Sequence, residues 1–429
     1  MKTKNIPSLF LTLSFLLILS CSKTEENTPI ININSLVLTA SSSDQLLVVN
    51  EEVDFVLTGD DGNTYTDQAV FYVSQAAISG STFTFNEEGT FEVYASYGGI
   101  NSNTLTYNVI TASSDNTLIV SNAKVLRNQE MTFSLVDNQG DDISSTATFY
   151  VDGSAISGNT YSSGSVGIFE VYAEYDVAGT PTQTDQLSFE VYIPKRKVVL
   201  EDYTGAWCGY CPAVAAAAES AHDVTDDIAI VAIHETSFTF PDPMHFDEVQ
   251  TLKDAFGVDG LPDARINRTT DWSDPYPTAS IISMAGEDTN VAIAINSQLS
   301  GLDLTVSVKV ISEVELAGSD KLVVYLLEEG IIYDQINYYN NDPTSPYYQL
   351  GNPIPDFVHN EVLRLSLTSV LGDNVSSTAA LTEYTRSFTT SILPEYNTSN
   401  LHIVVMLVSE DNSARNAQFS DIGEDKNYE

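Results

Sequence analysis

Cationic residues are scarce in this chain of 429 residues, which has 17 lysines and arginines against 59 aspartates and glutamates. A formal net charge of −42 repels phosphate backbones, so we expect no nucleic-acid partner. Hydrophobic residues still make up 43% of the chain, which is typical of folded domains rather than of a disordered acidic segment. The length exceeds one ordinary core, so several domains are expected.

Long apolar runs and several common catalytic motifs are also missing. The apolar stretch 9–19 is too short to span a bilayer, and no later segment is apolar enough to span a membrane. There is no G-x-S-x-G and no phosphate-binding glycine loop, so hydrolase and nucleotide-binding functions lack support. His234-Glu235 does not continue into an H-E-x-x-H metal motif. We therefore expect neither a cofactor nor a metal ion.

Only three cysteines are present, and the first of them, Cys21, ends an export-like segment. Two early lysines precede the apolar stretch, and Ile-Leu-Ser-Cys at 18–21 resembles a bacterial lipobox. The pattern predicts a signal peptide over 1–20 and a lipid on Cys21 that anchors the chain to a membrane. It also predicts a tether over 21–30. The alternative is an ordinary signal peptide with an incidental cysteine. The tether's Lys-Thr-Glu-Glu resembles a surface-export signal, so we expect an outer-membrane lipoprotein on the periplasmic or the cell-surface face.

An internal repeat follows the tether. Phe71-Tyr72-Val73 recurs as Phe149-Tyr150-Val151, an offset of 78 residues (149 − 71), and two further blocks recur at the same offset. Both copies are rich in Val, Phe, Tyr and Thr, with short alternating runs separated by turn residues. We predict two immunoglobulin-like β-sandwiches, over 31–112 and 113–193, that act as spacers.

Beyond a basic linker at 194–197, the pattern changes from all-β to alternating strands and helices. Apolar strands are predicted at 197–203 and 228–234, and helices at 211–223 and 247–256. The second helix leads through Leu261-Pro262 to a further strand at 264–267. We predict an α/β domain over 194–289, followed by a C-terminal β-sandwich over 290–429.

The strongest chemical signal is Trp207-Cys208-Gly209-Tyr210-Cys211-Pro212. Together with Asp202, six residues before Cys208, and with Leu261-Pro262, it resembles the thioredoxin fold. The resemblance implies a cis bond at Leu261-Pro262 and a substrate surface formed by Trp207, Leu261 and Pro262. The predicted fold class is therefore multidomain: two β-sandwich repeats, a thioredoxin-like α/β domain and a C-terminal β-sandwich.

The residues around the C-x-x-C predict which of the two cysteines attacks a substrate disulfide. Cys208 is nearest the helix N-terminus, which stabilises a thiolate, so it is the candidate nucleophile and Cys211 the resolving thiol. Asp202 would accept or relay the proton of Cys211. The partners would be protein thiols and disulfides. A static disulfide and a zinc site are the alternatives, although one C-x-x-C without further ligands argues against zinc.

A closer resemblance rests on the motif from Glu201 to Pro212, the Gly-Leu-Pro loop and Val358-His359-Asn360-Glu361-Val362-Leu363-Arg364. From about Lys195 to Phe419 the chain resembles the Omp28-related outer-membrane lipoproteins of Bacteroidota. Two functions remain open from the sequence. One is thiol–disulfide exchange, which would make the protein an oxidoreductase or isomerase. The other is a surface binding or structural lipoprotein that uses the thioredoxin fold as a scaffold.

Overall fold

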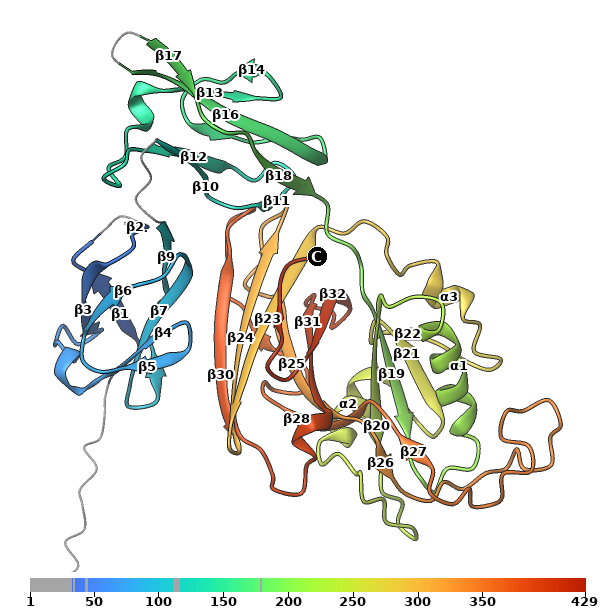
Figure 1. Cartoon of the computed structure of the whole chain (residues 1–429). Coiled ribbons are helices and arrows are strands. Elements are labelled where there is room, and N and C mark those ends of the chain that lie inside the picture. The colour runs from blue at the N-terminus through green and yellow to red at the C-terminus, as the bar shows by residue number, and fades with distance from the viewer. Residues whose placement is uncertain (1–32, 34, 43–44, 111–115, 178–179) are drawn as a thin grey trace, which may run out of the picture. The chain divides into compact units, whose positions relative to one another are not determined.

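The computed structural model describes residues 33, 35–42, 45–110, 116–177 and 180–429 (Figure 1). The predicted signal peptide, Cys21 and the tether over 21–30 lie outside the described residues. The chain divides into two compact units, 1–111 and 112–429. None of the helices in the described part is both long and apolar enough to cross a membrane.

The described part of the first unit is a β-sandwich of two sheets. One sheet has the order β1 (Leu36–Ala40), β3 (Glu51–Gly59) and β6 (Thr82–Phe85). The other contains β2 (Leu46–Val48), β9 (Leu105–Ile110), β7 (Gly89–Tyr97), β4 (Val70–Val73) and β5 (Ala76–Ile78), with β8 (Ile100–Asn101) paired to β7. Alternate residues point inward, as Val53, Phe55 and Leu57 of β3 do, and they form the core.

The second repeat has the same strand order within the second unit. One sheet has the order β10 (Thr117–Val120), β12 (Met131–Val136) and β15 (Thr160–Tyr161). The other has the order β11 (Lys124–Leu126), β18 (Leu187–Tyr192), β16 (Gly167–Val177), β13 (Thr148–Val151) and β14 (Ser154–Ala155), with β17 (Thr180–Gln183) paired to β16. The pair Phe71↔Ala95 corresponds to Phe149↔Ala173, each 78 residues later. The shared strand order is the result that duplication predicts.

The remainder of the second unit is built on a nine-stranded mixed sheet with the order β22-β21-β19-β20-β28-β25-β31-β32, with β29 paired to β25. Its strands are β19 (Val198–Thr204), β20 (Ile228–His234), β21 (Asp263–Ile266), β22 (Thr270–Asp271), β25 (Lys321–Glu328), β28 (Val362–Ser366), β29 (Asp373–Asn374), β31 (Leu401–Val408) and β32 (Ala414–Asp421). β19 runs parallel to β20, and β20 runs parallel to β28, while β25 is antiparallel to β28 and β31.

Both faces of this sheet are covered, as Figure 1 shows. Helices α1 (Pro212–His222) and α3 (Ala279–Ile282) share a core with Val198 and Leu200 of β19, whereas α2 (Val249–Phe256) packs with Val199 and Tyr203, whose side chains point the other way. On β25 and β31 a second sheet covers the face that α2 leaves free. That sheet has the order β30 (Tyr384–Ser391), β24 (Asp303–Ser312), β23 (Val291–Ser300) and β33 (Asp425–Lys426).

The helices predicted at 211–223 and 247–256 are present as α1 and α2, but the predicted α/β thioredoxin-like domain over 194–289 is wrong as a fold class. The strands of that region do not close a sheet of their own, because Ala232 of β20 pairs with Val362 of β28, far beyond the predicted boundary. The described residues contain only three short α-helices, and most of the regular structure is strand. This part of the chain is one β-rich body with helices at one end of its sheet.

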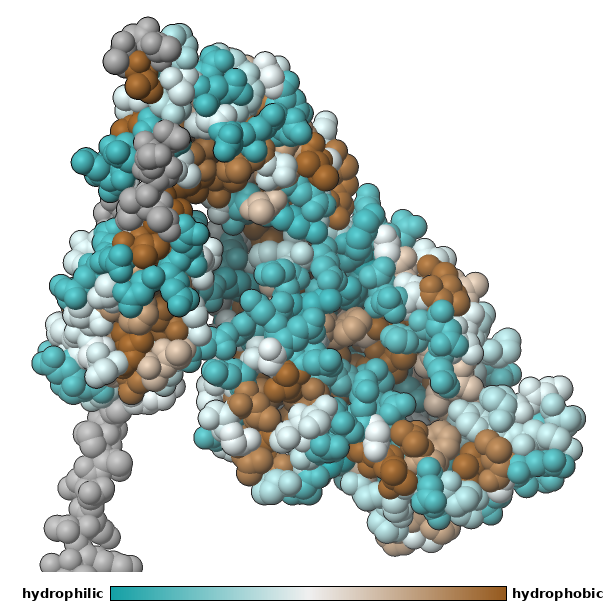
Figure 2. Space-filling view, in the orientation of Figure 1, coloured by the Kyte–Doolittle hydropathy of each residue, from teal (hydrophilic) through white to brown (hydrophobic). Residues whose placement is uncertain are grey.

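The surface of the molecule agrees with its composition. Hydrophilic residues cover much of the face shown in Figure 2, as the excess of carboxylates predicts. Among the exposed apolar side chains, Phe238 and Phe240 lie on the loop that follows β20.

Candidate functional site

Cys208 and Cys211 are joined by a disulfide that lies in the turn between β19 and α1. The turn is held by backbone hydrogen bonds from Cys208 N to Gly205 O and from Cys211 N to Cys208 O. Pro212 then occupies the first position of α1, where its missing N–H costs nothing. Both cysteines are buried, with relative exposures of 5% and 2%.

Residues 335–339, which we call the covering segment, account for this burial. They belong to the long excursion between β26 (Ile331–Ile332) and β27 (Val358–His359). Gln335 Nε2 donates to Cys208 O over 2.9 Å, and Tyr338 N donates to Gly209 O over 2.9 Å. A Cβ atom at Gly209 would lie only 2.5 Å from the ring of Tyr338, so the segment packs directly on the disulfide turn.

Thiol–disulfide exchange on protein substrates, which the C-x-x-C predicts, is therefore not the function that the structure supports. Exchange requires a thiolate to reach a disulfide sulfur, and access limits its rate. Here Cys208 is buried, and Gln335 and Tyr338 pack against the backbone of its turn. The region also lacks the separate thioredoxin-like domain on which that prediction depended. The main functional prediction is wrong, and the alternative, a surface binding protein, fits better.

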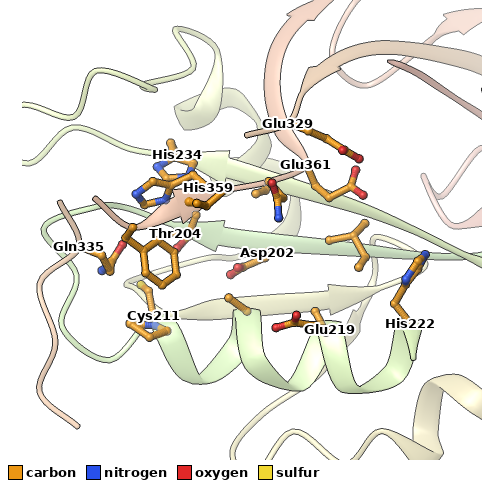
Figure 3. Close-up of a pocket in the computed structure, with 18 of the residues that line it drawn as sticks. Asp202, Thr204, Cys211, Glu219, His222, His234, Glu329, Gln335, His359 and Glu361 are labelled. Atoms are coloured by element: carbon orange, nitrogen blue, oxygen red, sulfur yellow. The ribbon is translucent and has the colours of Figure 1, made fainter. Parts of the chain in front are cut away.

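A cavity of about 550 Å³ lies beside the disulfide, between α1 and the ends of the central strands (Figure 3). Asp202 and Thr204 of β19 and Ala232 and His234 of β20 line its sheet side, because residues two apart on a strand face the same way. The other lining residues come mainly from α1 and from the segments around 329–335 and 357–361: Cys211, Pro212, Ala215, Ala218, Glu219, His222, Asp223, Ile230, Glu329, Gln335, Tyr347, Phe357, Val358, His359, Asn360 and Glu361.

Asp202 is the most unusual group in the cavity. It is only 4% exposed, and its Oδ1 atom has no hydrogen-bond partner among the described residues. Burial, with a further contribution from Asp263, raises the pKa of Asp202 to about 8. At neutral pH the side chain is mostly a neutral carboxylic acid, so it offers the cavity one O–H donor and one unsatisfied acceptor.

Two histidines form a second polar group at the cavity wall. His234 Nδ1 lies 2.9 Å from Asp242 Oδ2, which also accepts the backbone N–H of Ala206. The rings of His234 and His359 meet edge to face, with centroids 5.2 Å apart. Burial, followed by the neighbouring His234, lowers the pKa of His359 to about 4. His359 is therefore a neutral hydrogen-bonding group at physiological pH.

The structure brings together only some of the residues predicted from the sequence. Asp202 and Cys211 line the same cavity, but Cys208, Trp207, Leu261 and Pro262 do not. Trp207 donates its indole N–H to Glu235 O over 2.6 Å, which is a structural contact. The predicted cis bond at Leu261-Pro262 is confirmed.

Sequence reasoning missed several residues of the cavity. Glu361 lies in the segment from Val358 to Arg364, which carries the family resemblance, but the sequence predicts no role for its side chain. Gln335 and Glu329 carry no local signal, since their positions depend on pairing with distant strands.

Comparison with known proteins places part of the chain in context. The family model described as outer membrane protein Omp28 matches residues 249–426, which supports an outer-membrane protein. Among solved structures, HBP35 of Porphyromonas gingivalis matches with a TM-score of 0.43 and 18% identity, over 54% of this chain and 77% of that chain. No curated protein matches this chain.

Two further solved structures match the chain with lower TM-scores. Fibronectin(III)-like modules of Clostridium thermocellum CbhA match with a TM-score of 0.17 and 16% identity, over 36% of this chain and 93% of that chain. Domains 5–6 of the S-layer protein SbsC match with a TM-score of 0.17 and 18% identity, over 37% of this chain and 98% of that chain.

Proposed function

We propose that this chain is a lipid-anchored outer-membrane protein that binds a small ligand in the cavity beside α1. The observation that carries the proposal is the buried carboxyl of Asp202, which faces this cavity and whose Oδ1 has no hydrogen-bond partner in the described part of the chain. A buried polar group without a partner is costly, so a ligand that supplies the missing hydrogen bond gains stability there. A volume of about 550 Å³ also lies within the range typical of small-molecule sites.

The charges of the lining residues favour a cationic ligand. The side chains of Glu219, Asp223, Glu329 and Glu361 bring carboxylates to the cavity, whereas the buried His359 is neutral. A cation gains Coulomb energy from such a lining, and an N–H donor would also satisfy Asp202 Oδ1. We therefore propose a small organic amine as the ligand class.

The disulfide acts in this proposal as a structural clamp on the cavity wall. Cys211 and Pro212 both line the cavity at the start of α1. Cys208 is bonded to Cys211 and is held through its carbonyl by Gln335, which also lines the cavity. The cross-link therefore fixes the end of α1 relative to the segment that closes the cavity.

The proposal also includes the anchor and the repeats. Cys21 would carry the lipid, and the β-sandwiches would hold the cavity away from the membrane, on either the periplasmic or the cell-surface face. Mass spectrometry of the mature N-terminus tests the anchor, and an unmodified terminus with Cys21 removed would refute it.

Ligand binding can be tested with purified chain and a panel of small amines, such as putrescine, spermidine and arginine methyl ester, by calorimetry and thermal shift. We expect at least one amine to bind with a stoichiometry of one and to lose its affinity in Asp202→Leu. The matched control is Asp185→Asn in the second repeat, an exposed position that should leave binding unchanged. If no amine binds, or if Asp202→Leu binds as well as the parent, the cavity proposal is refuted.

A further inference from the structure

Two glutamates and a histidine meet at the ends of three neighbouring strands, β28, β25 and β31. Glu329 directly follows β25, Glu361 directly precedes β28, and His402 is the second residue of β31. The sheet register fixes this meeting, because Glu328 pairs with both Val362 and Leu401. The group is therefore placed by backbone pairing and not by flexible loops alone.

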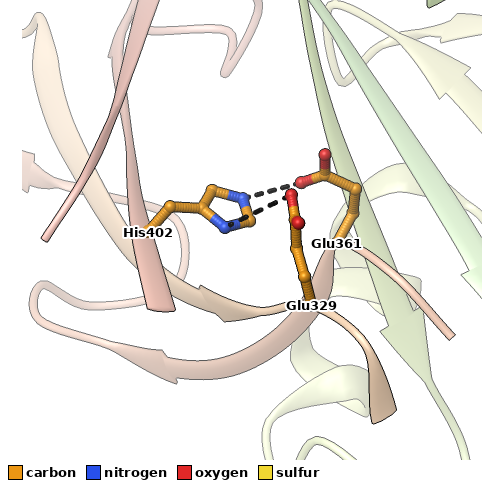
Figure 4. A group of neighbouring side chains, drawn as sticks. All are labelled: Glu329, Glu361 and His402. Atoms are coloured by element: carbon orange, nitrogen blue, oxygen red, sulfur yellow. Dashed lines mark hydrogen bonds and ion pairs between the residues drawn. The ribbon is translucent and has the colours of Figure 1, made fainter. Parts of the chain in front are cut away.

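The side chains converge, as Figure 4 shows. His402 Nε2 lies 2.7 Å from Glu361 Oε2, and His402 Nδ1 lies 4.0 Å from Glu329 Oε1. One potential ligand atom from each residue can be chosen so that all three lie within 4.8 Å of one another. The imidazole is buried in the strand layer, while Glu329 and Glu361 line the cavity.

The separations are close to those of a metal site. Zinc binds imidazole nitrogen and carboxylate oxygen at about 2.0–2.2 Å in a tetrahedral arrangement, so two ligand atoms on one ion lie roughly 3.4 Å apart. Bringing the three ligand atoms, which lie within 4.8 Å of one another, to that separation requires a side-chain movement of roughly 1–2 Å. Glu329 can supply it, since its side chain is 53% exposed.

We propose that Glu329, Glu361 and His402 bind one divalent transition-metal ion of the zinc class. One imidazole nitrogen with two carboxylate oxygens suits a borderline ion, whereas Ca²⁺ and Mg²⁺ prefer oxygen ligands alone. Three protein ligands leave at least one coordination position for water or another ligand. Because two of the three ligands line the cavity, the ion has an entry path from that side.

A second, independent observation marks the same cavity as a place for a ligand. Asp202 is buried, its Oδ1 has no hydrogen-bond partner among the residues that the structure describes, and its side chain projects into the same cavity between β19 and α1 (Figure 3). His222 and Glu219 project into it from α1. Among the described residues, the cavity therefore combines one buried oxygen without a hydrogen-bond partner, Asp202 Oδ1, with a set of nitrogen and oxygen ligands at one end.

The test uses the full chain, purified in a chelator and then dialysed. Zn²⁺ binding is measured by calorimetry in the presence of excess Mg²⁺, which occupies weak carboxylate sites on the acidic surface. Co²⁺ absorption provides a second readout, because its visible bands report inner-sphere nitrogen and oxygen ligands. We expect one Zn²⁺ per chain, and a loss of affinity of about tenfold or more in Glu329→Gln and in Glu361→Gln.

The matched control is Glu410→Gln, an exposed glutamate in the turn after β31, which should bind Zn²⁺ like the parent. Glu329→Gln keeps the test decisive if Glu361→Gln fails to fold, because the Glu329 side chain is exposed. Failure to detect saturable Zn²⁺ binding, or equal losses in Glu410→Gln and Glu329→Gln, would overturn the proposal.

Discussion

Arg268 and Glu201 form a fully buried ion pair, with Arg268 Nε 3.0 Å from Glu201 Oε1 and neither side chain exposed. The same guanidinium donates to Tyr325 Oη over 3.2 Å and to Val370 O over 2.9 Å. Glu201 belongs to β19 and Tyr325 to β25, two strands separated in the sheet by β20 and β28. Arg268 therefore links the helix-covered end of the sheet to its C-terminal strands.

The first prediction concerns this pair. Glu201→Gln leaves a buried charge without its partner and should lower the free energy of unfolding of the second unit by about 3–5 kcal/mol. Urea unfolding followed by tryptophan fluorescence measures it, since Trp207 and Trp272 are the two tryptophans of the chain and both lie in this unit. The exposed Lys195–Asp288 pair is the control, because Lys195→Met should cost less than about 1 kcal/mol. Equal effects at the two pairs would contradict this assignment.

The second prediction is a pH dependence caused by Asp202. Its pKa is about 8 in the folded chain against an ordinary value of 3.8, so the folded state binds more protons between these pH values. Stability therefore falls as pH rises through this window, by roughly 1.4 kcal/mol per pH unit from this group. Asp202→Asn removes that contribution, so the variant should match the parent near pH 4 and exceed its stability at pH 9. Urea unfolding at both pH values measures the difference, and an advantage confined to low pH would refute the prediction.

The third prediction concerns the covering segment. Gly209→Ala places a Cβ against the ring of Tyr338, so residues 335–339 must move away from the disulfide turn. After mild reduction, iodoacetamide should modify Cys208 faster in this variant than in the parent. Gly260→Ala is the matched control, because a Cβ there meets no atom within 4 Å. Mass spectrometry of the alkylated peptide gives the rates, and equal rates in all three proteins would show that the segment does not restrict access.

The fourth prediction treats the disulfide as a clamp. Replacing both Cys208 and Cys211 with alanine removes a cross-link that closes a very short loop, for which the chain-entropy estimate is about 2 kcal/mol. Thermal unfolding should shift downward by a few degrees while Zn²⁺ binding persists, since neither cysteine belongs to the proposed metal site. In the single variant Cys211→Ser, no mixed disulfide with an added disulfide-bonded protein should accumulate. Efficient trapping of that protein through Cys208 would contradict the clamp.

Features with a local or periodic signature could be predicted from the sequence. The 78-residue offset predicted the two repeats. The structure shows the same correspondence between side chains, because the rings of Tyr72 and Tyr94 stack with centroids 4.8 Å apart and those of Tyr150 and Tyr172 stack at the same distance. The Ala-rich run after Pro212 predicted a helix whose ends differ by one residue from the observed ends of α1. Capping residues and hydrophobic periodicity act over a few neighbours, so they can be read along the chain.

Pairing between distant strands could not be predicted in this way. Nothing near Ala232 indicates that its strand pairs with Val362, because both strands are simply apolar runs. For the same reason, the contact of the covering segment with the disulfide turn, which joins Gln335 to Cys208, could not be predicted. The cluster of Glu329, Glu361 and His402 could not be predicted either, because it depends on the register of three strands. The C-x-x-C motif was clear, but its burial depends on a segment more than a hundred residues later.

The late pairing of β20 has a consequence for the order in which this chain matures. One edge of β20 stays without its neighbour until β28 has emerged, and an unpaired apolar edge is a template for association with other chains. During synthesis, the region from β19 to β22 therefore has to be kept apart from other chains until the C-terminal strands arrive. A chain truncated at residue 289 should aggregate rather than fold, whereas the first repeat, which closes its own two sheets, can fold ahead of the rest.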